Sequence, residues 1–193
     1  MPPESAPLFL PVILGTVRRG RQSENVARFV AERLSKKPGT LTEVIDIRAV
    51  PMPLEDAGQA IKDPAFQALM QRSDGLVIVS PEYNHGVPGL LKHLLDSCLE
   101  EYIHKAAGIV GVSAGPWGGT RGIQGLLPVL RELGLVTIFW DLNFAAVRSA
   151  FGAAGELTDS AYEARADKFL DELIWMARTL RHGRQHIALK EGA

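Results

Sequence analysis

One stretch of the chain, residues 76–96, restricts its possible folds more than any other. The four apolar residues at 76–79 predict a buried strand that ends at Ser80 and Pro81. An amphipathic helix is predicted to begin near Pro88, since proline fits the first turn of a helix. The loop between them offers an aromatic ring, an amide and exposed main-chain N–H groups. At the end of a central parallel strand, such a loop is where an open α/β sheet binds its ligand.

Strand and helix patterns alternate five times along the chain. Apolar runs bounded by turn residues predict strands at residues 8–14, 41–47, 76–79, 106–113 and 134–140. Apolar residues at helical spacing predict helices at about 26–34, 64–72, 88–96, 123–133 and 158–180. This alternation predicts a three-layer α/β fold, in which helices cover both faces of a five-stranded parallel sheet.

Single residues set several of the predicted boundaries. Pro11 places the start of the first strand at Val12, unless that strand tolerates a proline at its start. Asp63, followed by proline, is a predicted N-cap. Pro128 predicts a kink in the fourth helix or a later start. Residues 160–163 match a capping box at the start of the last helix.

The whole chain, residues 1–193, is predicted to form one domain, because this length can enclose a sizeable hydrophobic core. Its ends, residues 1–7 and about 184–193, are predicted to be flexible. An irregular apolar segment is expected at residues 142–151. The formal net charge of -1 gives no reason to expect nucleic acid or an anionic membrane as a partner.

The composition predicts a cytoplasmic protein. The first seven residues lack the basic start and apolar run of a signal peptide. No apolar segment approaches the roughly 20 residues that span a bilayer. The single cysteine, Cys98, cannot form an internal disulfide, so a reducing compartment is expected. Its place on the apolar side of a predicted helix indicates an inert buried thiol.

The loop after the first predicted strand combines cationic and polar residues at the start of a helix: Arg18, Arg19, Arg21, Thr16, Gln22, Ser23 and Asn25. A helix N-terminus presents unpaired N–H groups and a partial positive charge, so this combination predicts a phosphate site. The loop is neither a Walker A motif nor G-x-G-x-x-G, and a phosphate monoester therefore fits better than a triphosphate or a dinucleotide. A solvated basic turn with a helix cap is the alternative.

A second glycine-rich loop follows the fourth predicted strand. Residues 111–115 match G-x-S-x-G, the nucleophile motif of serine hydrolases, with Ser113 at its centre. Asp141 and either His182 or His186 follow in the chain order of a catalytic triad. A hydrolase is the less favoured reading, because the loop continues through Pro-Trp-Gly-Gly where the motif needs a helix at once. The preferred interpretation is a flexible main chain that can approach a flat ring closely.

Three motifs together resemble one known family: Gly15-Thr-Val-Arg18 with Ser23 and Asn25, the run from Ser80 to Asp96, and Ser113-Ala-Gly-Pro-Trp-Gly-Gly119. From about Val12 to the last helix, the chain is similar to the NADPH-dependent FMN reductase family. This flavodoxin-like group includes quinone, azo-dye and chromate reductases. The resemblance implies a sheet in the order 2-1-3-4-5 with FMN at the strand ends. Thr16 stands where the family more often has serine, and Trp117 adds a large ring to the second glycine-rich loop.

The resemblance also implies which residues bind FMN, and no metal site is predicted. Around the ribityl phosphate it implies Thr16, Arg18, Gln22, Ser23 and Asn25. Along the isoalloxazine ring it implies Pro81, Glu82, Tyr83, Asn84, His85 and Gly86. Near the pyrimidine edge of the ring it implies Ser113, Ala114, Gly115, Trp117, Gly118 and Gly119.

The resemblance further implies a ping-pong reaction in a homodimer or homotetramer. NADPH or NADH would give hydride to flavin N5 and leave. A small acceptor, such as a quinone, an azo compound, free flavin or a metal oxyanion, would then take two electrons. No side chain is expected to transfer protons, although His85 is the one candidate donor. A flavodoxin-like electron carrier without NAD(P)H activity is the alternative, and the near-neutral charge argues against it.

Overall fold

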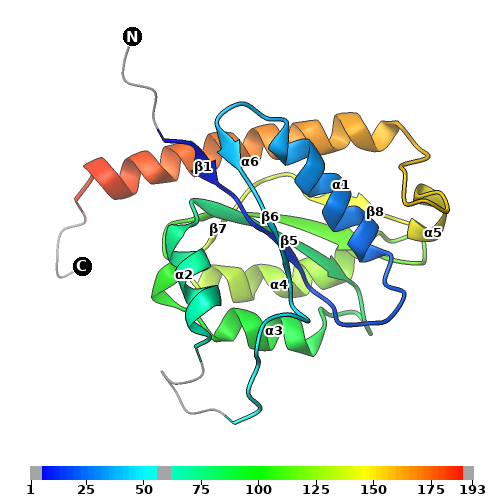
Figure 1. Cartoon of the computed structure of the whole chain (residues 1–193), viewed down its shortest axis with the longest axis horizontal. Coiled ribbons are helices and arrows are strands. Elements are labelled where there is room, and N and C mark those ends of the chain that lie inside the picture. The colour runs from blue at the N-terminus through cyan, green and yellow to red at the C-terminus, as the bar shows by residue number, and fades with distance from the viewer. Residues whose placement is uncertain (1–5, 56–61, 189–193) are drawn as a thin grey trace.

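The computed structural model of the protein describes residues 6–55 and 62–188. A parallel sheet lies between two layers of helices (Figure 1). The strands are β1 (Leu8–Phe9), β2 (Val12–Leu14), β3 (Thr40–Leu41), β4 (Val44–Asp46), β5 (Gly75–Pro81), β6 (Ala106–Val112), β7 (Val136–Thr137) and β8 (Leu142–Phe144). The helices are α1 (Ser23–Ser35), α2 (Pro64–Arg72), α3 (Gly89–Asp96), α4 (Thr120–Glu132), α5 (Val147–Ala150) and α6 (Ala161–His186), with a 3₁₀ turn η2 (Glu100–Tyr102).

The order of the strands confirms the predicted topology. β4, β2, β5 and β6 lie side by side, and both β7 and β8 pair with β6 at the far edge. All of these pairs are parallel. Counted by position the order is 2-1-3-4-5, with β7 and β8 sharing the fifth place. Because the strands run in one direction, the loops that follow them leave the same edge of the sheet.

Each of the first two predicted strands is divided into two pieces. Pro11 separates β1 from β2, and the strand of the main sheet begins at Val12 as predicted. β1 pairs with β3 in a small sheet of its own, with Leu8 opposite Thr40. β2 pairs with β4, with Val12 opposite Val44. Proline has no N–H to donate to a strand ladder, which explains the break at Pro11.

The fifth predicted strand, residues 134–140, is wrong in its extent. Only β7 forms there, and the chain returns to β6 as β8, within the segment that was expected to be irregular. Between the two strands the N–H groups of Phe139 and Trp140 donate to the Glu172 carboxylate, at 3.0 and 3.3 Å. A side chain of α6 therefore takes the place of a strand partner at this point of the edge.

Helices α2 and α4 test two of the predicted boundaries. The start of α2 is as predicted, since the N–H of Phe66 donates to Asp63 Oδ1 at 2.8 Å and Pro64 holds the first helical position. Helix α4 begins at Thr120, earlier than predicted, and contains Pro128 in its interior. A proline there removes one main-chain hydrogen bond of the helix without ending it.

The capping box predicted at residues 160–163 does not form. Ser160 makes no side-chain cap at the start of α6. Glu163 instead forms an ion pair with Arg33 of α1, with 3.2 Å between Oε2 and Nη1. The glutamate thus links the two helices that cover one face of the sheet.

The C-terminal end of α6 extends beyond its predicted end to His186. Arg181 and Arg184 of this extension pair with Asp74, just before β5. The remaining parts of the predicted flexible ends, residues 1–5 and 189–193, lie outside the described residues. Neither α6 nor any other helix in the described ranges is long and apolar enough to span a membrane.

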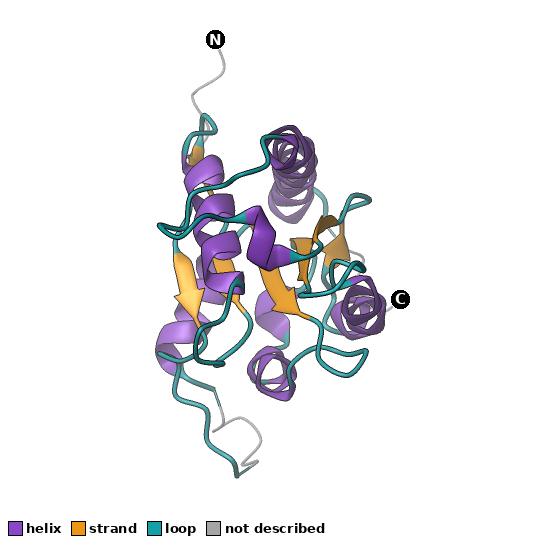
Figure 2. Cartoon of the chain, turned by 90° about the vertical axis from the view of Figure 1, so that its right-hand side faces the viewer, coloured by secondary structure: helices purple, strands orange, loops and turns teal. Residues whose placement is uncertain are grey.

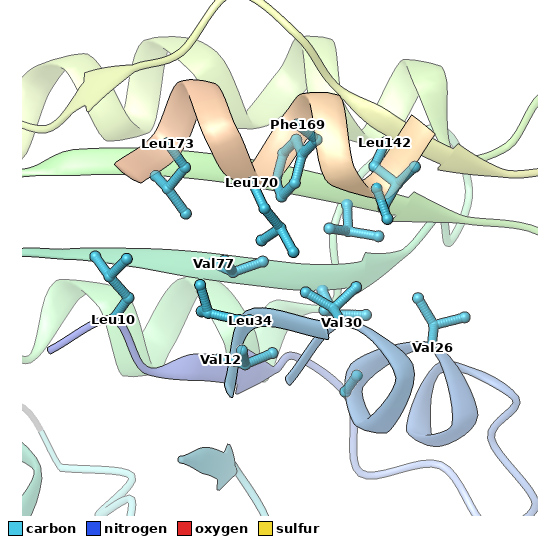
Figure 3. Close-up of a cluster of buried hydrophobic side chains, with 14 of the residues drawn as sticks. Leu10, Val12, Val26, Val30, Leu34, Val77, Leu142, Phe169, Leu170 and Leu173 are labelled. Atoms are coloured by element: carbon cyan, nitrogen blue, oxygen red, sulfur yellow. The ribbon is translucent and has the colours of Figure 1, made fainter. Parts of the chain in front are cut away.

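The buried apolar residues fill both faces of the sheet. On β5, Val77 and Val79 face α1 and α6, whereas Leu76 and Ile78 face α2, α3 and α4. Figure 3 shows the first of these clusters, where α1 and α6 meet the sheet: Leu10, Val12, Val26, Val30, Leu34, Val77, Leu142, Phe169, Leu170 and Leu173. Cys98 belongs to the second cluster, and burial raises the pKa of its thiol to about 11, as expected of an inert thiol.

Candidate cofactor-binding site

The loops after β2, β5 and β6 come together at the carboxyl edge of the sheet, the side of the molecule seen in Figure 2. They enclose a cavity of about 280 Å³, called here the first cavity. Its lining is Arg18, Arg19, Gly20, Arg21, Gln22, Ser23, Pro81, Glu82, Tyr83, Val112, Ser113, Ala114, Val147 and Arg148. The three loops predicted to carry the chemistry therefore meet in one place.

A second, more open cavity of about 600 Å³ adjoins the first. Both cavities are lined by Arg18, Glu82 and Tyr83, so they are neighbours along the loop after β5. The rest of the second cavity is lined by Thr16, Val17, Asn84, Pro88, Gly89 and Leu90. Its walls combine one cation with several apolar groups, which is the usual character of a small-molecule site.

Arg21 belongs to the internal structure of the first loop. Its side chain is only 3% exposed; it pairs with Asp46 at the end of β4 and donates to the Thr16 carbonyl. Burial would lower the pKa of Arg21, but the Asp46 carboxylate more than offsets this and raises it. Arg18 and Arg19 form no ion pair with any described residue. The pairing of Arg21 fixes the loop and leaves the other two guanidinium groups available.

The first turn of α1 opens into the first cavity. Ser23 is 3% exposed, and its Oγ has no hydrogen-bond partner among the described residues. Gln22, at the N-cap position, makes no side-chain cap. A buried polar group without a partner costs about 1–3 kcal/mol, so a ligand that bonds Ser23 would recover this free energy. The helix N-terminus adds unpaired N–H groups and partial positive charge.

Tyr83 joins the first loop to the second. Its hydroxyl is hydrogen-bonded to Thr16 Oγ1 at 2.9 Å, and the Arg18 N–H donates to the same Oγ1 at 3.3 Å. The buried Thr16 hydroxyl is therefore used within the protein. The Arg18 guanidinium lies 5.8 Å from the centre of the Tyr83 ring.

The loop after β5 turns back on itself within four residues. Tyr83 and Gly86 exchange two main-chain hydrogen bonds, of 2.9 and 3.0 Å. Between them, Asn84 and His85 have φ values of 51° and 66°. Two consecutive left-handed residues are typical of a type I′ turn. Such backbone costs free energy in residues other than glycine and is concentrated at functional sites.

Glu82 connects this turn to α4. Its Oε2 accepts from the N–H groups of Arg121 and Gly122, at 3.0 and 3.3 Å, in the first turn of the helix. A carboxylate is stabilised in this position by the helix dipole. The Arg121 guanidinium donates to His85 Nε2 at 3.2 Å, which holds the His85 ring on α4 and outside both cavities.

Gly119 of the third loop packs against β6, whereas Gly118 packs against Asn143 of β8. Gly118 and Gly119 have φ values of 57° and 81°, and a Cβ on Gly119 would lie 2.6 Å from the Val112 nitrogen. Ser113 Oγ donates to the Gly115 carbonyl at 2.8 Å. The close contact with β6 explains why a glycine is needed at position 119.

The serine hydrolase alternative is wrong. Ser113 lies at the carboxyl edge of the sheet, in the first cavity. His182 and His186 lie in a hollow with Ala6 and Leu8, at the amino edge. No triad can form between the two edges, because its members need hydrogen-bond contact.

Several predicted FMN-binding residues line neither cavity: Asn25, His85, Gly86, Gly115, Trp117, Gly118 and Gly119. Asn25 Nδ2 donates to Gln22 Oε1 at 3.3 Å, and Asn25 lines a different groove, beside Phe151. Trp117 is 60% exposed, with the Arg121 guanidinium 4.9 Å from its ring centre. The binding roles of these residues stay predictions.

Sequence reasoning missed other parts of the cavities. Val147 and Arg148, from α5, line the first cavity, and Val17, Pro88 and Leu90 line the second. Nothing in the sequence distinguishes Arg148 from the other exposed arginines. Its position depends on the return of the chain to β6 as β8, which the sequence pattern did not indicate.

The sequence match that decides the family covers residues 10–146, more than half of the chain, and the family is described as NADPH-dependent FMN reductase. The chain belongs to this family. The resemblance carried by the three loop motifs is thus confirmed. Reductases are oxidoreductases, so membership in the FMN reductase family also defines the class of chemistry.

Solved structures confirm the flavodoxin-like fold of this FMN reductase family member. FerB, a flavoenzyme NAD(P)H:(acceptor) oxidoreductase from Paracoccus denitrificans, matches with a TM-score of 0.72 at 20% identity, over 89% of this chain and 98% of FerB. A flavodoxin from Streptococcus pneumoniae matches with a TM-score of 0.58 at 14% identity, over 86% of this chain and 97% of the flavodoxin.

Curated relatives carry names from the same family. An NAD(P)H-dependent FMN reductase of Pseudomonas aeruginosa is 29% identical over 73% of this chain and 81% of its own length. A quinone reductase of Pseudomonas putida is 28% identical over 82% of this chain and 90% of its own. An NADPH azoreductase of a Bacillus species is 28% identical over 61% of this chain, and the match spans 65% of the azoreductase.

Proposed function

We propose that this chain is an FMN-dependent NAD(P)H oxidoreductase that passes two electrons to a small acceptor, such as a quinone, an azo compound, free flavin or a metal oxyanion. One observation carries the proposal. The buried Ser23 hydroxyl has no described partner, and it lies at the start of α1 in a cavity enclosed by three loops of a flavodoxin-like sheet. The relatives named azoreductase and quinone reductase support the class of acceptor.

The first cavity fits the phosphate of FMN. Ser23, Gln22 and the free N–H groups at the start of α1 would hold the phosphate, with Arg18 beside them. Glu82 is the one carboxylate among the described residues that line this cavity, and α4 already engages it. The phosphate would therefore meet cations and N–H groups without an opposing free carboxylate.

The chain would bind and orient the flavin, and its main chain would stabilise negative charge. When bound, FMN accepts hydride from NAD(P)H and gives two electrons to the acceptor. The N–H groups of Tyr83 and Gly86 are used within the turn. The N–H groups of Asn84, His85 and Ala114 have no described acceptor and stay free to donate to the ring.

The second cavity would receive NAD(P)H and the acceptor in turn. Val17, Pro88 and Leu90 give it apolar walls, and Arg18 belongs to both cavities. Successive use of one cavity suits a ping-pong reaction, because the first substrate leaves before the second binds.

The protein is further proposed to be a cytoplasmic homodimer or homotetramer. Phe139 and Trp175 are 78% and 62% exposed, and aromatic residues are enriched at protein interfaces. Leu142 and Phe144 are by contrast part of the core, so the apolar segment around residues 139–144 divides between surface and interior. Light scattering coupled to size-exclusion chromatography measures the oligomer directly.

The deciding experiment is a visible absorption spectrum of the purified protein with added FMN, followed by NADPH in the absence of oxygen. A perturbed flavin band that bleaches is the expected result. FMN that passes freely through a desalting column would contradict the proposal. Replacing NADPH with NADH identifies the preferred donor. An electron carrier would bind FMN but oxidise almost no NAD(P)H by itself.

A further inference from the structure

Arg148 lies in the first cavity but comes from outside the three loops that form most of it. It belongs to α5, which follows β8. Figure 1 shows α5 and the loop that leads into α1 at the same end of the molecule. The cavity therefore receives arginines from two distant parts of the chain, Arg18 and Arg19 before α1 and Arg148 after β8.

The main chain around Arg148 is held firmly against the third loop. The N–H of Ala146 donates to the Gly115 carbonyl at 2.8 Å, and the N–H of Val147 donates to the Ser113 carbonyl at 3.0 Å. Ala146 has φ 43° and ψ 44°, a left-handed conformation that costs free energy in an alanine. The buried Val147 packs into the core next to it. This strained and anchored segment gives Arg148 a defined position at the cavity.

The Arg148 guanidinium is free to bind an anion. Its side chain forms no hydrogen bond or ion pair with any residue in the described ranges, whereas Arg21 in the same lining is neutralised by Asp46. The unpaired Ser23 hydroxyl lines the same cavity. A phosphate monoester carries about 1.5 to 2 negative charges at neutral pH and has three strong acceptor oxygens, so it can use more than one arginine.

We propose that Arg148 is a further phosphate-binding residue of this site, acting with Ser23 and Arg18, and that it helps the site prefer FMN over riboflavin. This inference rests on the proposed function, because it names a further residue that binds the same cofactor. Arg148 would supply a charge-assisted hydrogen bond to the phosphate from α5, in addition to those from the start of α1.

The test measures flavin affinity, not activity. Apoprotein is titrated with FMN and, separately, with riboflavin, and binding is followed by quenching of flavin fluorescence. Arg148→Ala is expected to raise the Kd for FMN about tenfold and to leave the Kd for riboflavin unchanged. Arg148→Lys should recover part of the loss, because it keeps the charge but not the planar fork. Arg131→Ala is the matched control, since Arg131 is exposed in the last turn of α4 and lines neither cavity.

The possible outcomes separate the two proposals. If the wild-type protein binds neither flavin, the proposed function fails and the inference fails with it. If the wild type binds FMN and Arg148→Ala binds it equally well, only the inference is overturned. An equal loss for FMN and riboflavin would also overturn it, because Arg148 would then act on the ring system. Thermal melting followed by circular dichroism checks that each variant is folded.

Discussion

The buried Ser23 hydroxyl should have opposite effects on the stability of the apoprotein and on ligand binding. In the protein alone the hydroxyl is shielded from water and has no described partner, so it weakens the fold. With a phosphate in the first cavity, the same hydroxyl would gain an acceptor. The two effects of this side chain should therefore have opposite signs.

Ser23→Ala tests this opposition. The variant is expected to keep or raise the free energy of unfolding of the apoprotein, by up to about 1 kcal/mol, and to weaken FMN binding by about 1–2 kcal/mol. Ser97→Ala is the control, because Ser97 is also buried but its Oγ donates to the Leu94 carbonyl at 2.7 Å. It should lower stability and leave FMN affinity unchanged. Urea unfolding and flavin titration measure the two quantities, and a destabilised Ser23→Ala apoprotein would contradict the argument.

The arginines before α1 look alike in the sequence but differ in the structure. Arg18, Arg19 and Arg21 were predicted together as a phosphate site, and the basic turn was the alternative. Arg21 is in fact paired with Asp46, which is distant in sequence and lies at the end of β4. A local pattern could identify the basic loop, but it could not show which guanidinium a carboxylate on the neighbouring strand would neutralise.

Arg21→Ala should consequently reduce stability, whereas Arg18→Ala should reduce FMN affinity. Arg21→Ala is expected to lower the free energy of unfolding by about 2 kcal/mol, since it leaves the partly buried Asp46 without its main partner. Arg18→Ala should change stability little but weaken FMN binding by about 1.5 to 3 kcal/mol. Denaturant unfolding and flavin titration on both variants provide the comparison. Equal effects of the two substitutions on affinity would refute the distinction.

At the scale of elements, the loop between β6 and α4 contains tertiary contacts that its glycine-rich sequence does not predict. The sequence correctly indicated a glycine-rich loop at the end of a strand. It could not show that Gly119 gains its importance from contact with the Val112 nitrogen and Gly111, which arises only when the loop folds back on β6. The same limit applies to the capping box of α6, where Glu163 is attracted by Arg33 on another helix.

Gly119→Ala and Gly125→Ala form a matched pair on this element. An alanine at 119 would have to adopt φ 81° and would place its Cβ within 2.6 Å of main-chain atoms, so a loss of about 3 kcal/mol in unfolding free energy is expected. At Gly125, within α4, a Cβ meets nothing within 4 Å. Alanine there should stabilise the helix by about 0.5–1 kcal/mol. The melting temperatures of both variants test this prediction. A Gly119→Ala variant as stable as the wild type would contradict the close packing of Gly119 against β6.

At the scale of the whole molecule, the order of the strands and the meeting of the loops could be predicted because connectivity restricts them. Parallel strands joined by helices place successive loops on one edge, whatever the details of packing. The contribution of Arg148 could not be predicted in this way. It depends on the division of the fifth strand position between β7 and β8, and between these two strands Glu172 accepts from the N–H groups of Phe139 and Trp140.

The acid stability of the molecule should depend on Glu101, which joins η2 to α2. Burial would raise the pKa of Glu101, but hydrogen bonds from Lys62 and Gln67 lower it to about 2 from an ordinary value of 4.5. The unfolded chain therefore takes up the proton first as pH falls. The stabilising contribution is complete above pH 4.5 and is lost as the pH falls toward about 2.

Glu101→Gln should accordingly cost about 2 kcal/mol of unfolding free energy near neutral pH, and less as the pH approaches 2. Glu100→Gln, at the exposed neighbouring position, is the control for the loss of one carboxylate. Urea unfolding across the acid range measures both. Parallel profiles for Glu101→Gln and the wild type would show that the carboxylate does not carry this dependence.

The short strands at both edges of the sheet limit how copies of the protein can associate at high concentration. At one edge β4 offers three residues, and at the other β7 offers two and β8 three, with a break between them. Between β7 and β8, Glu172 already accepts from two N–H groups that could otherwise bond a strand of another molecule. A strand from another molecule would find too short a run of partners to extend the sheet, which protects against amyloid-like stacking. Contacts between copies would then have to form through exposed side chains such as Phe139 and Trp175.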